Sequence, residues 1–349
     1  MFWYVAAESA ELTAVKPLAR TILGETLALF RGKDGAPTAF PDRCLHRAGK
    51  LSKGWVVDGC LQCPYHGWVY DAKGSLCEIP SMGPRGRDEA SLGSRATKTY
   101  EARESQGYVY VRLEAPLERT RRSPGTVEFA SDPFRIPHHE DKTWGRVRLQ
   151  NRFHNNVVNC AENFIDIPHT AFVHPGIFRD SRRQKITAKV TRANGSVVTT
   201  YRGETDNLGW FKWLLNPSGR EIGHVDSFHM PNVTCVEYEF GPRRRFAITS
   251  QSVPVASDET LVYTDLSYDY GWLNPLAGPV VRWQGQKVID QDLEVLKDQM
   301  DVIEKHGSRF SHSPADVIHV LVESVCEELA RGRDPRLLPE KTQEVEFWV

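Results

Sequence analysis

The sequence has no surplus of charge of one sign and no long apolar run. Its 349 residues include 44 Lys and Arg against 45 Asp and Glu, a formal net charge of −1, which gives no general reason to expect a nucleic acid or a membrane surface as partner. No apolar run reaches the length of a membrane span, and the start of the chain lacks the pattern of a secretory signal. With 40% hydrophobic and 26% charged residues, the composition is that of a globular protein long enough for two domains.

The chain has few cysteines for its length, and they do not form the pattern of a disulfide framework. Seven cysteines, an odd number, are scattered from residue 44 to residue 326. This distribution fits a reducing compartment in which some cysteines serve as ligands, so we expect a cytoplasmic protein. A Gly-x-Gly-x-x-Gly loop is missing as well, so the chain offers no dinucleotide-binding site of that type.

The first third of the sequence predicts a small all-β unit. Short runs with strand character alternate with turns that contain Gly and Asp. The runs are 1–6, 26–30 and 108–113, and the turns include 33–35 and 71–74.

Two loops in this unit each pair one cysteine with one histidine. One residue separates Cys44 from His46, two residues separate Cys63 from His66, and sixteen lie between the pairs. Two thiolates with two imidazoles also make a structural zinc site, which is the alternative interpretation. Zinc fingers usually group Cys with Cys and His with His, whereas one of each per loop suits a [2Fe–2S] cluster with two cysteines on one iron and two histidines on the other. The spacing therefore favours the cluster.

The second half predicts an antiparallel sheet followed by helices. A polar connector, rich in Arg over 119–125, precedes it and is interpreted as a linker, with a docking patch for an acidic redox partner as the alternative. Period-two alternation predicts strands over 146–149, 189–191, 197–200, 233–240, 246–253 and 261–268, with a hairpin turn at Asn194-Gly195. An aromatic run at 209–215 is either a pocket lid or core packing. Helices are expected over about 280–305 and over 314–331, the latter capped by Ser313, before a polar tail.

Two histidines five residues apart, His169 and His174, are the centre of a candidate mononuclear metal site. Asp166 precedes His169 by three residues, so the two would share a helix face, and Pro168 can bend that helix. Two neutral imidazoles and one carboxylate make the facial triad of non-haem Fe(II) oxygenases, which leaves coordination positions open. The alternative is a pair of hydrogen-bonded histidines in an ordinary core helix.

Asp292 is the candidate for the third ligand. It lies at the margin of the apolar stripe of the helix expected over about 280–305, apart from the exposed acids of the same helix. A carboxylate that leans toward a core is costly unless it is paired or bound to a metal. We therefore expect Asp292 to bind the metal; the alternative is a partly exposed acid beside an arginine.

With these residues in view, the chain resembles the catalytic (alpha) subunit of the Rieske non-haem iron oxygenases over nearly its full length. The segments 44–46, Cys-Pro-Tyr-His-Gly-Trp at 63–68 and Asp-x-x-His-x4-His at 166–174 carry the resemblance. It is closest to the homotrimeric branch of O- and N-demethylases and ring-hydroxylating monooxygenases. Gly49 and Tyr65 stand where the respiratory and photosynthetic Rieske proteins have two further cysteines, which points to the oxygenase branch.

The resemblance implies an α+β fold. An N-terminal all-β Rieske [2Fe–2S] domain over 1–115 would be joined by a linker over 116–143 to a catalytic domain over 144–349. The catalytic domain would be of the helix-grip (START/Bet v1-like) type, with an antiparallel sheet and C-terminal helices.

The resemblance also implies roles for single residues. The [2Fe–2S] cluster would be held by Cys44, His46, Cys63 and His66, and the mononuclear Fe(II) by His169, His174 and Asp292. Asp166 would lie between an iron histidine and a cluster histidine (His46 or His66) of the next subunit in a head-to-tail homotrimer. Asn163 would lie near the iron, and Trp283, the aromatic residue before the distal aspartate, would be a pocket wall.

The activity implied is that of a terminal oxygenase component, a monooxygenase or dioxygenase. It would use O2 and NAD(P)H-derived electrons to hydroxylate or oxidatively demethylate a small, aromatic or cyclic substrate. Because the chain has no nucleotide motif and no second cysteine cluster, the electrons would come from a separate reductase or ferredoxin. A Rieske-type electron-transfer protein with a non-catalytic ligand-binding domain is the alternative. No nucleic acid or membrane is expected as partner.

Overall fold

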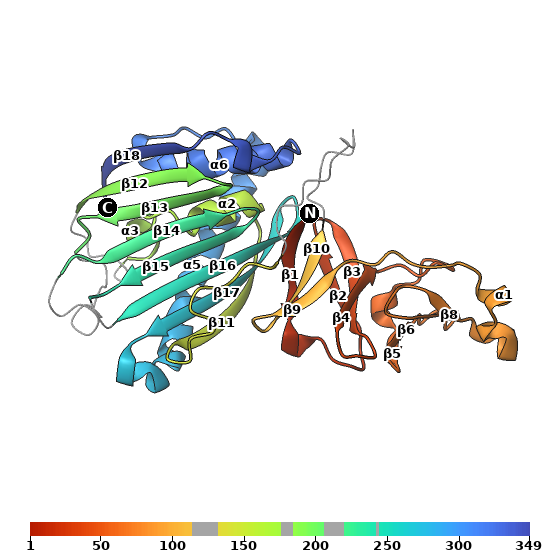
Figure 1. Ribbon diagram of the computed structural model, residues 1–349. Helices are drawn as coiled ribbons and strands as arrows, with labels where there is room; N and C mark the ends of the chain where they lie inside the picture. The colour runs from red at the N-terminus through yellow and green to blue at the C-terminus, as the bar shows by residue number, and fades with distance from the viewer. Residues whose placement is uncertain (114–131, 176–183, 206–219, 242–243) are drawn as a thin grey trace. The chain divides into compact units, whose positions relative to one another are not determined.

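The computed structural model describes residues 1–113, 132–175, 184–205, 220–241 and 244–349 (Figure 1). They form two compact units, one made of the strands up to residue 113 and the other of the strands and helices from residue 145 onward. The aromatic run at 209–215 and the docking patch at 119–125 lie outside the described residues, as does much of the linker expected over 116–143. The boundaries of that linker stay predictions. None of the helices in the described part of the chain has the length and apolar character needed to cross a bilayer.

The first unit is all β, as the sequence predicted, and consists of three antiparallel sheets. The first sheet has the strand order β1-β10-β9, the second β2-β3-β4 and the third β5-β6-β7-β8. Their bounds are β1 (Phe2–Glu8), β2 (Leu18–Ile22), β3 (Glu25–Arg31), β4 (Pro37–Pro41), β5 (Trp55–Val57), β6 (Cys60–Gln62), β7 (Val69–Tyr70), β8 (Leu76–Glu78), β9 (Ala102–Ser105) and β10 (Tyr108–Leu113), with the short helix α1 (Glu89–Leu92) after β8.

The second unit is built on one eight-stranded antiparallel sheet with the order β11-β17-β16-β15-β14-β13-β12-β18. The strands are β11 (Gly145–Phe153), β12 (Lys185–Ala193), β13 (Ser196–Arg202), β14 (Gly223–His229), β15 (Val233–Glu239), β16 (Arg245–Ala256), β17 (Glu259–Asp269) and β18 (Lys341–Trp348). The predicted hairpin turn between β12 and β13 is confirmed. Asn194 and Gly195 both have positive φ, 52° and 74°, as a two-residue turn of the I′ type requires.

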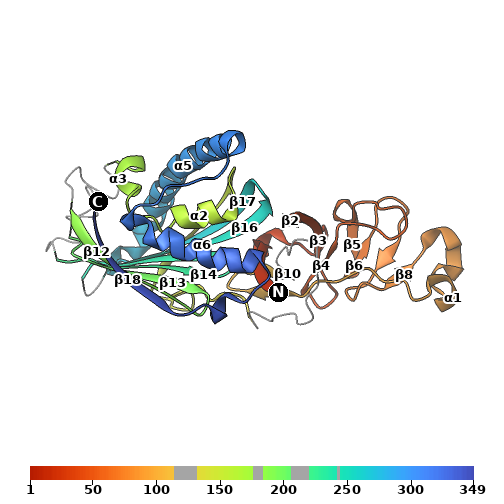
Figure 2. The same cartoon turned by 90° about the horizontal axis from the view of Figure 1, so that it is seen from above.

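Four helices of the described residues lie together on one face of this sheet: α2 (Val157–Asn163), α3 (Thr170–Val173), α5 (Asn274–His306) and α6 (Val317–Ala330) (Figure 2). The apolar stripe predicted for α5 is buried at Ile289, Leu296 and Met300. Gly285 lets α5 lie close to β17, because a Cβ at this position would come within 2.4 Å of the Leu266 side chain. The α+β architecture expected from the resemblance is thus present, with the helices packed against the sheet.

Two elements after residue 270 differ from the sequence prediction. The polar tail expected after residue 331 contains an edge strand, β18, which pairs with β12 and places Val345 and Phe347 against the core. The long helix begins at Asn274, six residues before the expected start near 280. The tail was misjudged because five of the eight side chains of β18 are polar, and the strand with which it pairs lies some 150 residues earlier in the chain.

Candidate metal centres

The two Cys/His loops of the first unit bring two thiols together in its core. Cys44 and Cys63 are only 2% and 1% exposed, and each belongs to the hydrophobic cluster that also contains Phe30 and Leu51. Burial raises the pKa of the Cys63 thiol. The Cys44 sulfur lies 3.2 Å from the Tyr70 hydroxyl. A thiolate here needs a cation beside it, because the apolar surroundings disfavour an isolated charge.

The histidines of the same loops lie at the surface. The His46 and His66 rings are exposed, with centroids 4.4 Å apart, and His46 stacks on Trp68 at 4.7 Å. Among the described residues, no three of these four donors meet within 4.8 Å, the spacing found at the second candidate site. A single zinc ion needs all its donors at one point, whereas a two-iron cluster takes thiols on one side and imidazoles on the other. The donor set therefore fits the [2Fe–2S] cluster.

The histidine segment of the second unit is folded differently from the single helix that the sequence predicted. The helix α2, capped by Asn156, ends at Asn163, and α3 begins only at Thr170, so Asp166 and His169 lie in the connecting turn. Ile165 and Ile167 are buried and anchor this turn in the core. Pro168 lacks the amide hydrogen that a continuous helix would need there. The two side chains still meet, with His169 Nδ1 3.4 Å from Asp166 Oδ2.

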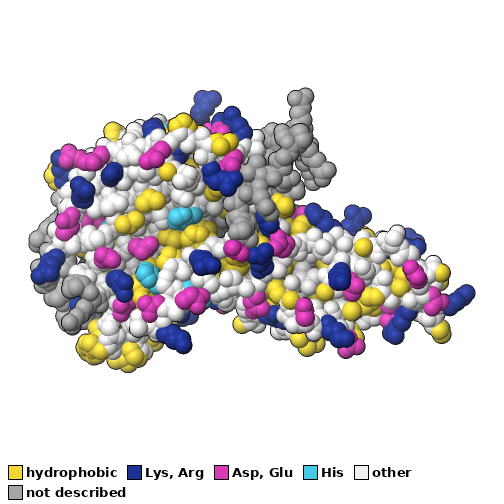
Figure 3. All heavy atoms as spheres, in the orientation of Figure 1, with side chains coloured by type: hydrophobic (Ala, Val, Ile, Leu, Met, Phe, Trp, Pro, Cys, Tyr) yellow, Lys and Arg dark blue, Asp and Glu magenta, His cyan; other side chains and the backbone are white. Residues whose placement is uncertain are grey.

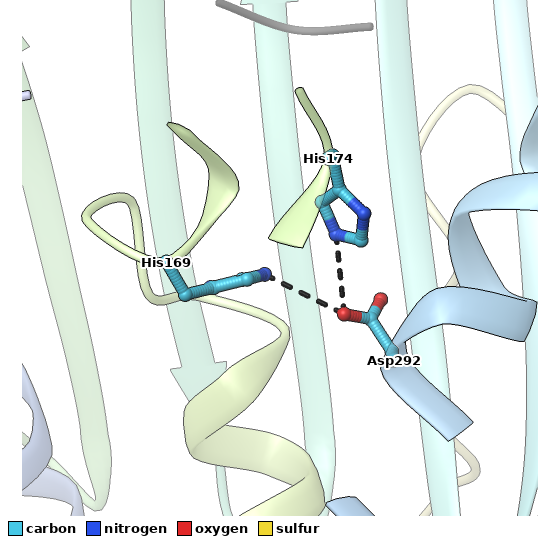
Figure 4. Close-up of side chains that lie close together, drawn as sticks. All are labelled: His169, His174 and Asp292. Atoms are coloured by element: carbon cyan, nitrogen blue, oxygen red, sulfur yellow. Dashed lines mark ion pairs between the residues drawn. The ribbon is translucent and has the colours of Figure 1, made fainter. Parts of the chain in front are cut away.

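The structure brings His169, His174 and Asp292 together (Figure 4). His174 Nε2 lies 3.1 Å and His169 Nε2 3.6 Å from the same oxygen, Oδ1, of Asp292. His174 and Asp292 are buried and His169 is mostly buried. One donor atom from each residue lies within 4.8 Å of the other two. Two imidazoles and a carboxylate at this spacing form the donor set of a facial triad.

The hydrogen-bond partners of the two imidazoles support a metal at this point. His174 Nδ1 lies 2.9 Å from Gln291 Oε1, an acceptor, so Nδ1 carries the proton and the Nε2 lone pair points at Asp292. Asp292 Oδ1 is buried and accepts no hydrogen bond of good geometry from the described residues. Burial by itself lowers the pKa of His169, but Asp166 and Asp292 raise it to about 9. The site therefore favours positive charge at this point, carried either by a proton on His169 or by a metal cation that takes its place.

Gln291 and His319 are two further residues of this site that the sequence did not reveal. Gln291 precedes Asp292 on α5 and contacts His174 as described, while His319 of α6 has its Nε2 3.7 Å from Asp166 Oδ1. Burial would raise the pKa of Asp166, but His169 and His319 hold it well below its usual range. The only sequence signal for Gln291 was its position next to Asp292, the predicted ligand on the same helix. No nearby sequence feature pointed to His319.

A cavity of about 370 Å³ opens beside the triad. Most of its lining is apolar, from α5 and from the sheet strands β15 to β17, and the polar side chains in it include His169, His174, Asp292 and Asn163. Asn163 thus lies near the triad, and its Oδ1 is buried without a hydrogen-bond partner among the described residues. A mostly apolar cavity with a few polar groups is the usual form of a small-molecule site.

Trp283 is not among the described residues that line this cavity. Its side chain is 63% exposed, while the next two residues of α5, Gln284 and Gly285, face the cavity. One residue along a helix turns the side chain by about 100°, which is enough to exchange the inner for the outer face. Leu276 and Trp283 are seven residues apart on α5 and so share a helix face, and with Trp272 just before the helix they form an exposed apolar patch. In Figure 3, charged side chains of both signs are interspersed with apolar ones over the visible face of the molecule.

Comparisons with known proteins agree with both centres. Residues 2–101 match the family model of the Rieske [2Fe-2S] domain, and residues 153–331 match that of the vanillate O-demethylase oxygenase C-terminal domain. The oxygenase component of dicamba O-demethylase from Stenotrophomonas maltophilia is 28% identical over 345 residues, which cover 94% of this chain and 96% of that protein.

Solved structures show the same fold. The crystal structure of dicamba monooxygenase bound to dicamba has a TM-score of 0.76 at 24% identity, covering 94% of this chain and 96% of that one. The structure of NdmA from Pseudomonas putida CBB5 has a TM-score of 0.75 at 20% identity, covering 98% and 96%. At such identities, the likeness shows the fold alone.

Proposed function

Because the chain belongs to the Rieske oxygenase family with a catalytic domain of the vanillate O-demethylase type, we propose that it hydroxylates or oxidatively demethylates a small cyclic or aromatic substrate. Like its homologues it is an oxidoreductase, the terminal oxygenase component of a multicomponent system, and acts with a separate reductase or ferredoxin. A Rieske-type electron carrier with a non-catalytic domain is not favoured, since the homologues are oxygenases.

One observation carries the proposal: the three triad side chains form part of the wall of an apolar cavity of about 370 Å³. A substrate held there would lie beside the metal and out of bulk water. The described lining includes the rings of Phe153, Phe240 and Phe246, which offer flat apolar surface to a ring of similar size. A cavity of this volume suits a small molecule of one or two rings.

We assign the cluster to Cys44, His46, Cys63 and His66, and the mononuclear iron to His169, His174 and Asp292. When bound, the cluster supplies single electrons and the iron activates O2 for insertion into a C–H bond. The protein's own part is to hold ligands and substrate. Gln291 orients His174, Asp166 orients His169, and the apolar walls exclude water. Hydroxylation of an O- or N-methyl carbon would give a hemiacetal or hemiaminal, which breaks down with loss of formaldehyde.

The assembly and the compartment are also proposals. A homotrimer in the cytoplasm would place Asp166 between the two centres of neighbouring subunits. The exposed apolar patch of Trp272, Leu276 and Trp283 supports a subunit contact, since such patches commonly mark interfaces. The seven cysteines, all of them among the described residues, form no disulfide, which supports a reducing compartment.

Iron counting tests the proposal. The oxygenase should hold three irons and two acid-labile sulfides per chain, and an electron carrier only two irons. His169→Ala should lose the mononuclear iron and keep the visible absorption of the cluster, because the two donor sets lie in separate units. His154→Ala is the matched control, since His154 belongs to a partly exposed group with Asp258 and Glu304 that is not among the described residues lining the cavity, and it should keep all three irons. Loss of iron and cluster together from folded His169→Ala would contradict the assignment.

Turnover is tested by supplying NADH, a surrogate reductase and O2, and screening methoxy- and N-methyl-substituted ring compounds. The expected result is substrate-dependent O2 uptake with formaldehyde release, or a hydroxylated product. A fully iron-loaded enzyme that reduces no O2 with any ring compound would count against the proposed substrate class.

A further inference from the structure

A buried cluster of ionisable side chains lies in the wall of the cavity away from the triad residues. His224 and Asp226 alternate on β14 and so share one face, while Tyr201 is the β13 residue paired with His224 and Glu204 follows the end of β13. All four are at most 5% exposed. None of them is needed to hold the metal, and the proposed reaction assigns them no role.

Every polar atom that this cluster directs inward is paired. His224 Nδ1 lies 2.7 Å from Glu204 Oε2, and His224 Nε2 lies 3.0 Å from Asp226 Oδ1. The Tyr201 hydroxyl donates to Asp226 Oδ2 at 2.9 Å. Since both ring nitrogens of His224 face carboxylate oxygens, both carry protons, and the ring is an imidazolium.

The surroundings of His224 support this charge state. Burial by itself lowers the pKa of His224, but the negative charges of Asp226 and Glu204 raise it to about 9. The ring also lies between two aromatic rings, with centroids 4.6 Å from Tyr201 and 4.2 Å from Tyr238. The positive charge of His224 is thus shared between two carboxylates, those of Glu204 and Asp226.

Two members of the cluster, His224 and Asp226, line the cavity. The imidazolium has no N–H left for a ligand, because both are directed at carboxylates. Asp226 keeps acceptor capacity, since a carboxylate has about four lone-pair positions and two hydrogen bonds use two of them. Among the described residues that line the cavity there is no Lys or Arg. This wall can therefore accept hydrogen bonds and attract positive charge, but it offers a substrate carboxylate no cationic partner.

We propose that this wall selects a ring substrate that carries a protonated amine, held by Asp226, over the corresponding acid. The inference rests on the proposed function, in which the cavity is the substrate site. The reacting methyl group or C–H bond would then lie on the part of the molecule that faces the triad. A buried charge pair between amine and carboxylate adds affinity when both groups are held in place and hydrogen-bonded, as Asp226 is by Tyr201 and His224.

Three matched probes test the inference: 4-methoxybenzylamine, 4-methoxybenzyl alcohol and 4-methoxybenzoate. They share the ring and the O-methyl group, and the group opposite the methoxy substituent carries a positive, zero or negative charge near neutral pH. Binding is measured by calorimetry on iron-loaded enzyme without O2. We expect the amine to bind about tenfold more tightly than the alcohol, and the benzoate to bind most weakly. The benzoate binding most tightly, or all three binding alike, would overturn the proposal without any variant.

The Asp226→Asn variant then assigns the preference to this side chain. It keeps the shape of the residue and removes the charge, so the amine should lose about tenfold in affinity while the alcohol stays within about twofold. Asp258→Asn is the control, because it removes one negative charge at a partly exposed position outside the described lining of the cavity and should change neither affinity. An equal loss for all three probes in a folded Asp226→Asn protein with intact cluster absorbance would mean a purely structural role and would overturn the assignment.

Readmitting O2 with reductase and NADH separates this inference from the proposed function. Suppose that the amine binds preferentially but no methoxy compound yields formaldehyde and no ring is hydroxylated. This result would overturn the proposed function and leave the proposed binding preference standing. Formaldehyde from the benzoate but not from the amine would support the proposed function and overturn the selection of amines.

Discussion

His319 Nε2 lies 3.7 Å from Asp166 Oδ1, while the other oxygen of the same carboxylate faces His169. The resemblance predicted that Asp166 would bridge an iron histidine and a cluster histidine of the next subunit. Within its own chain it already has a second histidine partner, on α6. A carboxylate has lone pairs for both, so the arrangement is compatible with a bridge and adds a third histidine to it.

Asp166→Asn should keep both metal centres and lose most of the substrate-driven oxidation of the cluster. The variant retains the shape of the side chain but removes the charge and one acceptor that orient His169. The measurement is single-turnover stopped flow on pre-reduced enzyme, following the cluster colour after O2 and substrate are added. A rate equal to that of the wild type, or full activity from a monomer, would end the bridging role.

The His319→Gln variant tests whether electron transfer depends on the His319 partner of Asp166 or on its proposed partner in the next subunit. If the connection runs between subunits, this variant should slow cluster oxidation by less than about threefold, since the bridge itself remains. If His319 is the partner that matters, the variant should slow it as much as Asp166→Asn does. Both variants are compared at equal iron content, so that a loss of metal is not counted as a loss of electron transfer.

Asp292→Ala should abolish turnover and empty the mononuclear site with little change in melting temperature. The side chain is 5% exposed and its Oδ1 faces both imidazoles, so its removal deletes a ligand. Removing a buried carboxylate also relieves its desolvation, which offsets the lost contacts with the histidines. Iron analysis and thermal melting check this. Asp290→Ala is the control, an exposed acid two residues earlier on the same helix. An active Asp292→Ala enzyme would refute the triad.

Gln291→Leu should weaken iron binding by roughly 10- to 100-fold and leave the cluster intact. The Leu side chain cannot accept the His174 Nδ1 proton, so the imidazole loses the contact that fixes its orientation. Competition with a chelator measures the affinity. Gln286→Leu on the same helix is the control, because the native Gln286 donates hydrogen bonds to Asn151 and Asp290 and, within the described part of the chain, to no proposed metal ligand. This variant should bind iron as the wild type does. Equal affinities in the two variants would show that Gln291 does not position His174.

His224 should stabilise the fold below pH 6.5 and lose that effect as the pH rises to about 9. Its pKa in the folded chain is raised to about 9 from an ordinary value of 6.5, so the folded state holds the proton more tightly than the unfolded state. The wild type should therefore melt at a higher temperature than His224→Gln. This difference in melting temperature should be largest at pH 6 and smallest above pH 9.

The control for this experiment is His229→Gln on the same strand. Burial lowers the pKa of His229, so its protonation opposes folding and the variant should gain stability relative to the wild type as the pH falls below 6.5. A pH-independent difference between the wild type and His224→Gln would mean that His224 is not charged in the folded protein.

The sequence by itself pointed to both candidate ligand sets and to most strands. Cys44, His46, Cys63 and His66 could be proposed as cluster ligands because they lie in two short loops, whose spacing is a local property. Asp292 could be proposed as a metal ligand because a helix stripe shows which residue leans inward. The strands β15 to β17 were predicted from the alternation of apolar and polar residues, because successive side chains of a strand point to opposite faces of the sheet.

Only the tertiary structure decided which residues surround those ligands. Gln291 and His319 became visible through contacts to His174 and Asp166, and Gln284 instead of Trp283 faces the cavity because of the rotation of α5. The cluster of Glu204, His224 and Asp226 depends on how β13 pairs with β14 across a connection of some twenty residues. Such pairings are settled by burial of the whole sheet face, so no local pattern records them.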